Sequence, residues 1–340
     1  MSPPLDSDER SHEPTHEPTQ KGSRQRAAWT EQRERGSLWV LRVMRWIAVS
    51  AGRPAARVVL HPIALYFLIA NGKARRASRA YLTRALHRPA ALRDVYRHIH
   101  HFAGAILDRV YFLQDRLREF DLRSTGLDVL DAAIAQGDGV MLVGAHLGSF
   151  EALRAIGQER GVKVAMLMFE DNARLITRTL AAIAPQAQLH TIALGRAGAM
   201  LSLRRWLDGG GIAGLLADRT LPGETERSHS ISHPHSHSHT RQLPFLGEPA
   251  RFSDGPFRLA ALLRRQVVFM AGLYLGGKRY ELRFVELADF RGPVATGDGE
   301  ARILAAMQRY VMLLEALCIE SPYNWFNFFD FWAPDAASAE

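Results

Sequence analysis

The sequence predicts an α/β protein whose mostly parallel central sheet is flanked by helices. Between residues 128 and 216, short apolar runs alternate with segments of helical periodicity, which is typical of right-handed βαβ units. The run at 140–143 is apolar throughout and lies between glycines, as expected for a strand covered on both faces. With 340 residues and 47% hydrophobic content, the chain can bury one large core, so we expect a single α/β domain with helical additions.

Composition divides the chain into parts. Residues 1–32 are polar and Pro-rich and cannot offset the entropy of ordering, so we expect a disordered tail. Residues 33–120 are expected to form an N-terminal helical, membrane-associated region, 121–332 the α/β domain, and 333–340 a second tail. Within the domain, residues 220–242 form a His-rich, low-complexity segment that we expect to be a mobile loop.

The N-terminal region contains apolar segments that carry arginine and aromatic side chains. Neither segment offers about 20 clean apolar residues, and His61-Pro62 interrupts the second, which argues against an ordinary transmembrane helix. The pattern is typical of helices that lie in a membrane interface, with arginines on anionic headgroups. Packing of these helices on the domain is an equal alternative. The basic and aromatic residues concerned are Arg42, Arg45, Arg53, Arg57, Trp39, Trp46, Tyr66 and Phe67.

Two further helices are predicted at Ala74–Arg88 and Ala90–Gln114. In the second, His98 and His101 share the i, i+3 spacing of a metal site, but without acidic companions a solvated or capping role is favoured. The following elements are expected at Asp128–Gln136 (helix), Val140–Val143, Val162–Met168, Arg174–Ile183 (helix), Leu189–Leu194, Ala197–Leu207 (helix), Gly211–Leu216, Val267–Tyr274, Tyr280–Glu286 and Glu300–Glu320 (helix).

The stretch Gly137–Glu151 combines this strand with a Gly-rich bend and a His/Glu pair. We expect His146 to follow the carboxyl end of the strand, where ligands bind in open α/β sheets, and Ser149 to cap a helix that contains Glu151. A neutral imidazole held by a carboxylate can take a proton from an alcohol, so His146 is predicted as general base and Glu151 as its orienter. An ordinary loop histidine is the alternative. Asp218 and Arg219 follow another predicted strand and should lie near the same rim.

The formal charge of +8 implies an acidic partner, which can be nucleic acid, an anionic membrane or an acidic carrier protein. The single Cys318 excludes an intrachain disulfide framework, fits a reducing compartment and is expected in the core. The alternating histidines of the 220–242 segment could bind a transition metal loosely, but without carboxylates or cysteines they more often decorate a loop.

As a set, these motifs resemble the bacterial lipid A biosynthesis lauroyl/myristoyl acyltransferase family, within the lysophospholipid and glycerolipid acyltransferase superfamily. AHLGSFE resembles its His-x-x-x-x-Asp/Glu block, LLADR its later Asp block, and LPFLGEPARFSDGPFRLA its Pro-Phe-Phe-Gly block. The match in order and spacing spans about residues 35–332. The N-terminal helices and the tail PYNWFNFFDFW are most similar to the subgroup that accompanies aryl polyene and flexirubin-type pigment gene sets.

The resemblance implies a glycerolipid acyltransferase-like fold and transfer of a fatty or polyenoyl group from acyl carrier protein to a hydroxyl of a lipid or glycolipid, at the cytoplasmic face of the inner membrane. It implies direct attack on the thioester, without a metal or cofactor. Nucleic-acid binding ranks last, because the charge clusters beside apolar stripes and not on a recognisable reading helix. The implied catalytic residues are His146 and Glu151, and the implied substrate-binding residues are Ser149, Asn172, Arg174, Asp218, Arg219, Phe245 and Gly247.

Departures from the family pattern concern the acceptor. In MLMFEDNAR, Met168 and Phe169 stand where the family has an arginine, and only Asn172 matches, with Arg174 as a possible substitute. Near the C-terminus Asp330-Phe331-Trp332 replaces a basic pair. Fewer fixed cations suggest an acceptor other than a bisphosphorylated disaccharide. Two alternative functions stay open: a thioesterase or lipid hydrolase that uses the same dyad, and a non-catalytic module that binds membrane and carrier protein.

Overall fold

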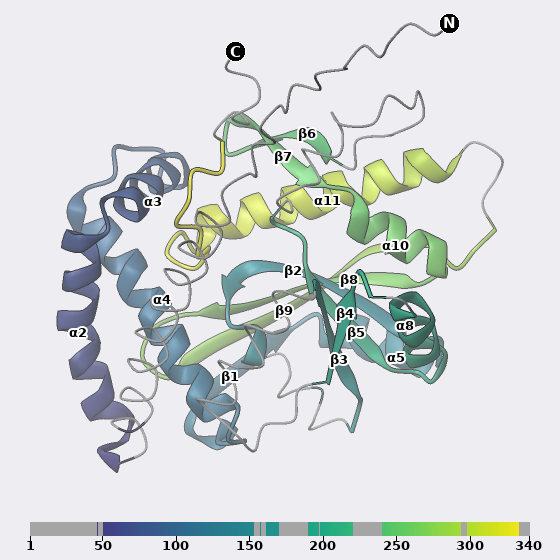
Figure 1. The fold of residues 1–340 in the computed structure, drawn as a ribbon, viewed down its shortest axis with the longest axis horizontal. Helices are drawn as coiled ribbons and strands as arrows, with labels where there is room; N and C mark the ends of the chain where they lie inside the picture. The colour runs from purple at the N-terminus through teal and green to yellow at the C-terminus, as the bar shows by residue number, and fades with distance from the viewer. Residues whose placement is uncertain are drawn as a thin grey trace, which may run out of the picture.

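The computed structural model describes residues 46, 50–152, 157, 161–169, 190–196, 198–219, 240–293 and 298–332. Its centre is a seven-stranded sheet of order β1-β9-β8-β2-β5-β3-β4, and a separate hairpin is formed by β6 and β7 (Figure 1). The strands are β1 Asp121–Thr125, β2 Val140–Gly148, β3 Val164–Phe169, β4 His190–Leu194, β5 Ile212–Leu216, β6 Thr240–Phe245, β7 Glu248–Ser253, β8 Gln266–Tyr274 and β9 Arg279–Asp289.

The predicted α/β class with a mostly parallel sheet is confirmed. Strands β8, β2, β5, β3 and β4 are parallel, whereas β9 runs antiparallel to β8 and pairs in parallel with β1. The centre of the sheet is formed by β2 and β8, whose apolar residues are buried on both faces. A strand buried in this way needs apolar side chains at every position, which explains the unbroken run at 140–143.

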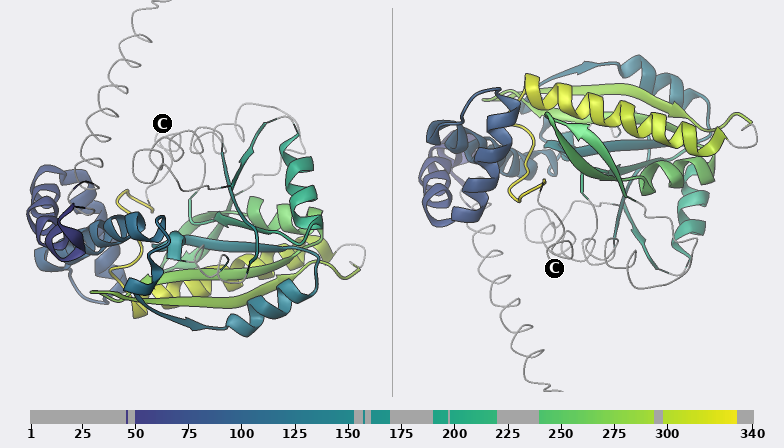
Figure 2. Two further views of the ribbon diagram at one scale, coloured as in Figure 1. Left: turned by 90° about the horizontal axis from the view of Figure 1, so that it is seen from below. Right: turned by 90° about the horizontal axis from the view of Figure 1, so that it is seen from above.

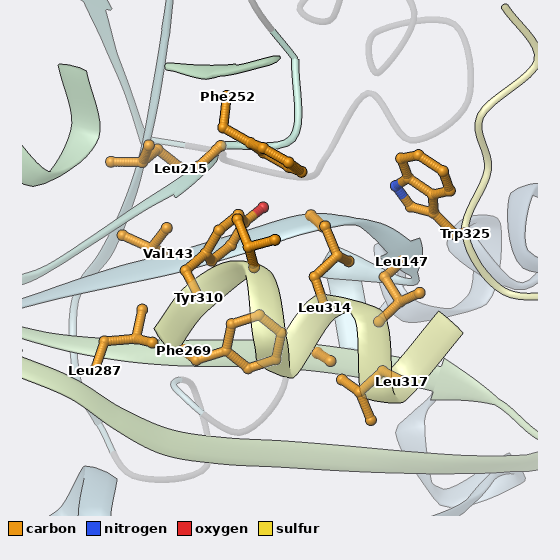
Figure 3. Packing of buried hydrophobic residues seen from close by; sticks show 14 of the residues in the cluster. Val143, Leu147, Leu215, Phe252, Phe269, Leu287, Tyr310, Leu314, Leu317 and Trp325 are labelled. Carbon is orange, nitrogen blue, oxygen red and sulfur yellow. The ribbon is translucent and has the colours of Figure 1, made fainter. Parts of the chain in front are cut away.

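The two faces of the sheet carry different helices. The helices are α2 Gly52–Ala70, α3 Gly72–Ala85, α4 Leu92–Phe112, α5 Leu127–Ala135, α8 Ala199–Asp208, α10 Gly255–Leu263 and α11 Asp298–Glu320. Met141 and Val143 face a cluster that includes residues of α8, α10, α11 and the hairpin, while Val140 and Leu142 face α5 and the second half of α4. In Figure 3 α11 directs Tyr310, Leu314 and Leu317 into the first cluster.

The N-terminal helices α2, α3 and α4 gather at one end of the sheet (Figure 2). The Arg53 side chain is 5% exposed, and its Nε lies 2.7 Å from Asp108 Oδ1 of α4. The Arg57 guanidinium donates to the Tyr274 hydroxyl at 2.5 Å. These two arginines therefore hold α2 against the domain, which is the packing alternative, and do not reach outward to headgroups. Their partners are distant in sequence, so composition alone could not decide between the two alternatives.

The remaining differences from the predicted elements are local. The short strand β1 was not predicted, because its residues are mostly exposed and polar at the edge of the sheet. The predicted C-terminal boundary of the mobile loop, residue 242, is wrong, because Thr240–Gln242 already pair with Arg251–Ser253 in the hairpin. The helix expected at Arg174–Ile183, most of the His-rich segment and both tails lie outside the residues that the structure describes.

Candidate active site

The carboxyl end of β2 carries His146, and the strand continues past it to Gly148. This corrects the expectation that His146 follows the strand. The C-terminal aromatic segment prolongs the pairing, because the Phe326 amide donates to the His146 carbonyl at 2.7 Å and the Gly148 amide donates to the Asn324 carbonyl at 2.9 Å. The backbone at His146 is therefore held by a segment 180 residues away along the chain.

The imidazole of His146 is paired with Asp218. In the parallel register of β2 with β5, Gly144 lies opposite Leu216, so two residues further along His146 meets Asp218. His146 Nδ1 lies 2.8 Å from Asp218 Oδ1, and the His146 backbone amide donates to Asp218 Oδ2 at 3.0 Å. The expectation that Asp218 lies near His146 is confirmed.

Asp218 is ionised, and its charge fixes the tautomer of His146. Burial raises the pKa of the Asp218 carboxyl, but the His146 charge and hydrogen bonds from His146 and the Trp325 indole outweigh burial and lower it to about 2. The Trp325 Nε1 donates to Oδ2 at 2.9 Å. Because a carboxylate only accepts, Nδ1 of His146 carries the proton, and Nε2 is the nitrogen that can act as a base.

The predicted orienting contact from Glu151 is wrong in this structure. The Glu151 carboxylate lies 2.7 Å from Nε of Arg109 on α4 and accepts from the Ser149 hydroxyl at 3.3 Å. Glu151 follows the bend after β2, whereas the strand register brings Asp218 to Nδ1. The spacing of residues along one chain could not show which of two nearby carboxylates reaches the imidazole.

A close approach of β2 and β8 fixes this bend. Gly148 has φ +71°, and a Cβ at this position would lie 1.9 Å from the Gly272 carbonyl oxygen. The next amide, of Ser149, donates to that same oxygen at 2.8 Å. A side chain at 148 would meet both a backbone clash and a disfavoured conformation, so glycine is required where the chain turns from His146 toward Glu151.

His146 lines a cavity of about 340 Å³. Its walls combine polar groups from the end of β2 with aromatic side chains of α4 and of the C-terminal segment. His146 is one-third exposed, so it is accessible from the cavity while Asp218 is buried behind it. The lining residues are Phe102, Ala105, Ile106, Arg109, Ala145, His146, Gly148, Ser149, Phe150, Glu151, Leu216, Arg219, Phe326, Phe328 and Phe329.

The structure brings only some of the predicted substrate-binding residues to this cavity. Ser149 and Arg219 line it. Phe245 is buried, with its ring centroid 5.3 Å from that of Trp325, and Gly247 lies in the turn between β6 and β7, so neither belongs to the cavity wall. Asn172 and Arg174 fall outside the described residues.

Arg109, Trp325 and the phenylalanines of the cavity were not predicted as site residues. Arg109 belongs to a helix that precedes the α/β core, and no local motif marks it. The aromatic richness of the segment 323–332 was visible in the sequence, but its pairing with β2 was not. Cys318 is fully buried in the first core cluster, as predicted.

His98 is neither solvated nor a helix cap. It is fully buried and bonded to Ser78 and to the Trp325 carbonyl, and burial lowers its pKa to about 4. Within the described ranges, no group of three or more His, Cys, Asp or Glu side chains is arranged to hold a metal ion. No model of a known protein family matches the chain, and no curated protein matches it either.

Proposed function

We propose that this protein is an O-acyltransferase that moves a fatty acyl group from acyl carrier protein to a hydroxyl of a lipid or glycolipid acceptor. The observation that carries the proposal is the His146–Asp218 pair, whose imidazole opens into a cavity walled mainly by apolar side chains. An imidazole whose Nδ1 is held by a carboxylate suits removal of a proton from an alcohol, and an apolar, partly aromatic cavity suits an acyl chain.

In the proposed reaction, Nε2 of His146 takes the hydroxyl proton of the acceptor. The acceptor oxygen then forms a bond to the thioester carbonyl carbon, and the resulting tetrahedral intermediate collapses with cleavage of the carbon–sulfur bond. The proton on Nε2 passes to the leaving thiol. Asp218 stabilises the imidazolium that exists between these two proton transfers. Direct transfer fits the burial of Cys318, the one cysteine of the chain, whose pKa burial raises.

Glu151 and Arg109 stay part of the proposed site in a different role. Their ion pair crosses from the bend after β2 to α4 and forms one wall of the cavity. Arg219 supplies a second cation at the cavity, with its guanidinium 5.5 Å from the centroid of the Phe329 ring. These groups can position polar parts of the donor or acceptor near His146, while the phenylalanines contact the chain.

We further propose that the protein works at an anionic membrane surface, the inner membrane's cytoplasmic face, with α2 in the interface. This helix alone, among the residues described, is long and apolar enough to cross a membrane, and one side of it packs on α4. Its outer side exposes Val58, Leu65, Tyr66 and Ile69, the last two by 66% and 68%. The spacing of these residues places them in one stripe, which is suited to lying in the interface.

The cations for anionic headgroups come from the helix that follows. Lys73, Arg76 and Arg79 are exposed on α3, directly after the apolar stripe, and α3 contains no acidic residue. An apolar stripe beside a basic helix is the pattern of a protein that binds an anionic lipid surface. The same net positive charge suits an acidic carrier protein as donor.

Comparison of lipids from cells with and without the protein by mass spectrometry tests the transferase proposal. We expect an acylated lipid that disappears with the gene and is not restored by His146→Ala. The purified protein should form the same product from acyl carrier thioester and the lipid extract. Release of free fatty acid in place of a new ester would instead support a hydrolase, and carrier binding without any turnover would support a non-catalytic module.

Vesicle co-sedimentation tests the membrane proposal. The double substitution Tyr66→Asp with Ile69→Asp should abolish binding to vesicles that contain phosphatidylglycerol, because it places two charges in the apolar stripe. Leu262→Asp on α10 is the matched control, since this leucine is 73% exposed and α10 lies on the opposite side of the molecule from α2 (Figure 1), so binding should stay unchanged. Undiminished binding by the double variant would overturn the proposed orientation.

A further inference from the structure

We infer that His98 is a positioning residue for the His146–Asp218 pair and acts through the backbone carbonyl and the indole N–H of Trp325. The inference rests on the proposed role of His146. It concerns a histidine on α4 that lies outside the cavity wall and that the proposed reaction does not use. The contacts that carry it are two sets of hydrogen bonds, one from α3 to the Trp325 carbonyl and one from the Trp325 indole to the imidazole of His146, joined by the covalent frame of Trp325.

The first half of the path fixes the backbone of Trp325. His98 Nε2 lies 2.8 Å from the Trp325 carbonyl oxygen, and His98 Nδ1 lies 2.8 Å from the Ser78 hydroxyl. A carbonyl oxygen only accepts, so Nε2 carries the proton and Nδ1 accepts from Ser78. Burial keeps His98 neutral near pH 7, which is the form that can make both bonds at once.

The second half of the path runs through the indole. Trp325 is fully buried, and its Nε1 donates to Asp218 Oδ2, the same oxygen that accepts from the His146 backbone amide. The other carboxylate oxygen is thereby directed at His146 Nδ1. Figure 3 shows Trp325 beside Leu147, with which it also forms a β-bridge. Because the carbonyl and the indole belong to one residue, His98 controls where the indole donor lies.

A simple packing role for His98 is the alternative, since its ring stacks on Phe328 with centroids 4.6 Å apart. Two substitutions separate the roles. His98→Phe keeps an aromatic ring and loses the donor, whereas His98→Gln loses the ring and can place an amide N–H near the position of Nε2. Tyr81→Phe is the matched control, because it removes a hydroxyl that donates to the Pro322 carbonyl at 2.9 Å in the same C-terminal segment.

The test measures the rate at which the Trp325 indole proton exchanges with solvent, in ¹⁵N-labelled full-length protein. The chain has six tryptophans, and the Trp325 signal is identified by its loss in Trp325→Phe. In His98→Phe we expect this proton to exchange with solvent at least tenfold faster than in the wild type. In His98→Gln and Tyr81→Phe its exchange should stay within threefold. Where His98→Phe does not fold, His98→Asn must show the same increase, because the shorter amide does not reach the carbonyl.

Wild-type exchange in His98→Phe would overturn the inference, as would an equal increase in Tyr81→Phe or His98→Gln. An activity assay adds a second readout: kcat for acyl transfer should fall at least tenfold in His98→Phe with KM unchanged, and His98→Gln should restore it. If the wild type transfers no acyl group, the proposed function fails, while the exchange measurement still decides whether His98 positions the pair.

Discussion

The substitution Asp218→Asn separates the two carboxylates near His146. Oδ2 of Asp218 accepts from two fixed donors, the His146 amide and the Trp325 indole. An asparagine at 218 must therefore place its oxygen at the Oδ2 position and its NH₂ group toward His146 Nδ1. That group would donate to Nδ1 and force the imidazole proton onto Nε2, so the base would be lost although the shape of the site is kept.

The size of the effect follows from the loss of both roles of Asp218. Burial raises the pKa of the Asp218 carboxyl, but the His146 charge and the hydrogen bonds from His146 and the Trp325 indole lower it, so the wild-type site holds a carboxylate that an amide does not replace. A positioned general base contributes about 10²-fold to 10⁴-fold to a rate. The same substitution in a Ser-His-Asp protease lowers kcat by about 10⁴-fold. We therefore expect a loss of about 10²-fold to 10⁴-fold in kcat.

The matched control is Glu151→Gln, which removes a charge of the same sign in the same cavity without touching Nδ1. We expect this variant to retain at least tenfold more activity than Asp218→Asn in the acyl-transfer assay. ¹⁵N chemical shifts of the His146 ring report the tautomer independently of activity. A wild-type tautomer and more than a tenth of wild-type kcat in Asp218→Asn would refute the reasoning, as would an equal loss in both variants.

Three stability predictions follow from the packing. Gly148→Ala should lower the free energy of unfolding by at least about 3 kcal/mol in urea denaturation, whereas Gly137→Ala, which has a positive φ but no atom near the added Cβ, should cost only about 1 kcal/mol. Arg53→Ala leaves a buried carboxylate unpaired and should cost about 3–5 kcal/mol, against less than about 1 kcal/mol for Arg123→Ala at an exposed pair. His98 has a folded-state pKa below its unfolded value, so its contribution is present above about pH 6.5 and is lost as the pH falls through 4. The difference in unfolding free energy between the wild type and His98→Gln should therefore shift by about 3 kcal/mol over this range, and a constant difference would contradict the assignment.

The sequence was sufficient to predict the helices and strands that are buried evenly along their length. The start of β2, the strands β5 and β8 and the long amphipathic helices α4 and α11 were predicted within a few residues, because burial on one face or on both leaves a periodic signal. The antiparallel course of β9 was not predicted, since direction in a sheet depends on pairing and not on local pattern. The exposed edge strand β1 left no apolar signal at all.

The residues of the site were likewise predicted only in part. The motif around His146 identified the base and the carboxyl end of its strand, and Asp218 was expected at the same rim. Which carboxylate reaches Nδ1 depends on the β2–β5 register, and the sequence contains no direct record of that register. Arg109 lies more than 40 residues from its partner Glu151 in the sequence, and Trp325 lies more than 100 residues from its partner Asp218. The contributions of Arg109 and Trp325 therefore depend on tertiary contacts.

The most direct test of the proposed function incubates the acyl carrier thioester with the lipid that serves as acceptor in the cell. The released thiol and the newly formed ester are measured in the same reaction. For the wild-type protein we predict one ester for each thiol released, and for His146→Ala neither product above the uncatalysed rate. Thiol release without ester, or wild-type rates from His146→Ala, would contradict direct acyl transfer with His146 as the base.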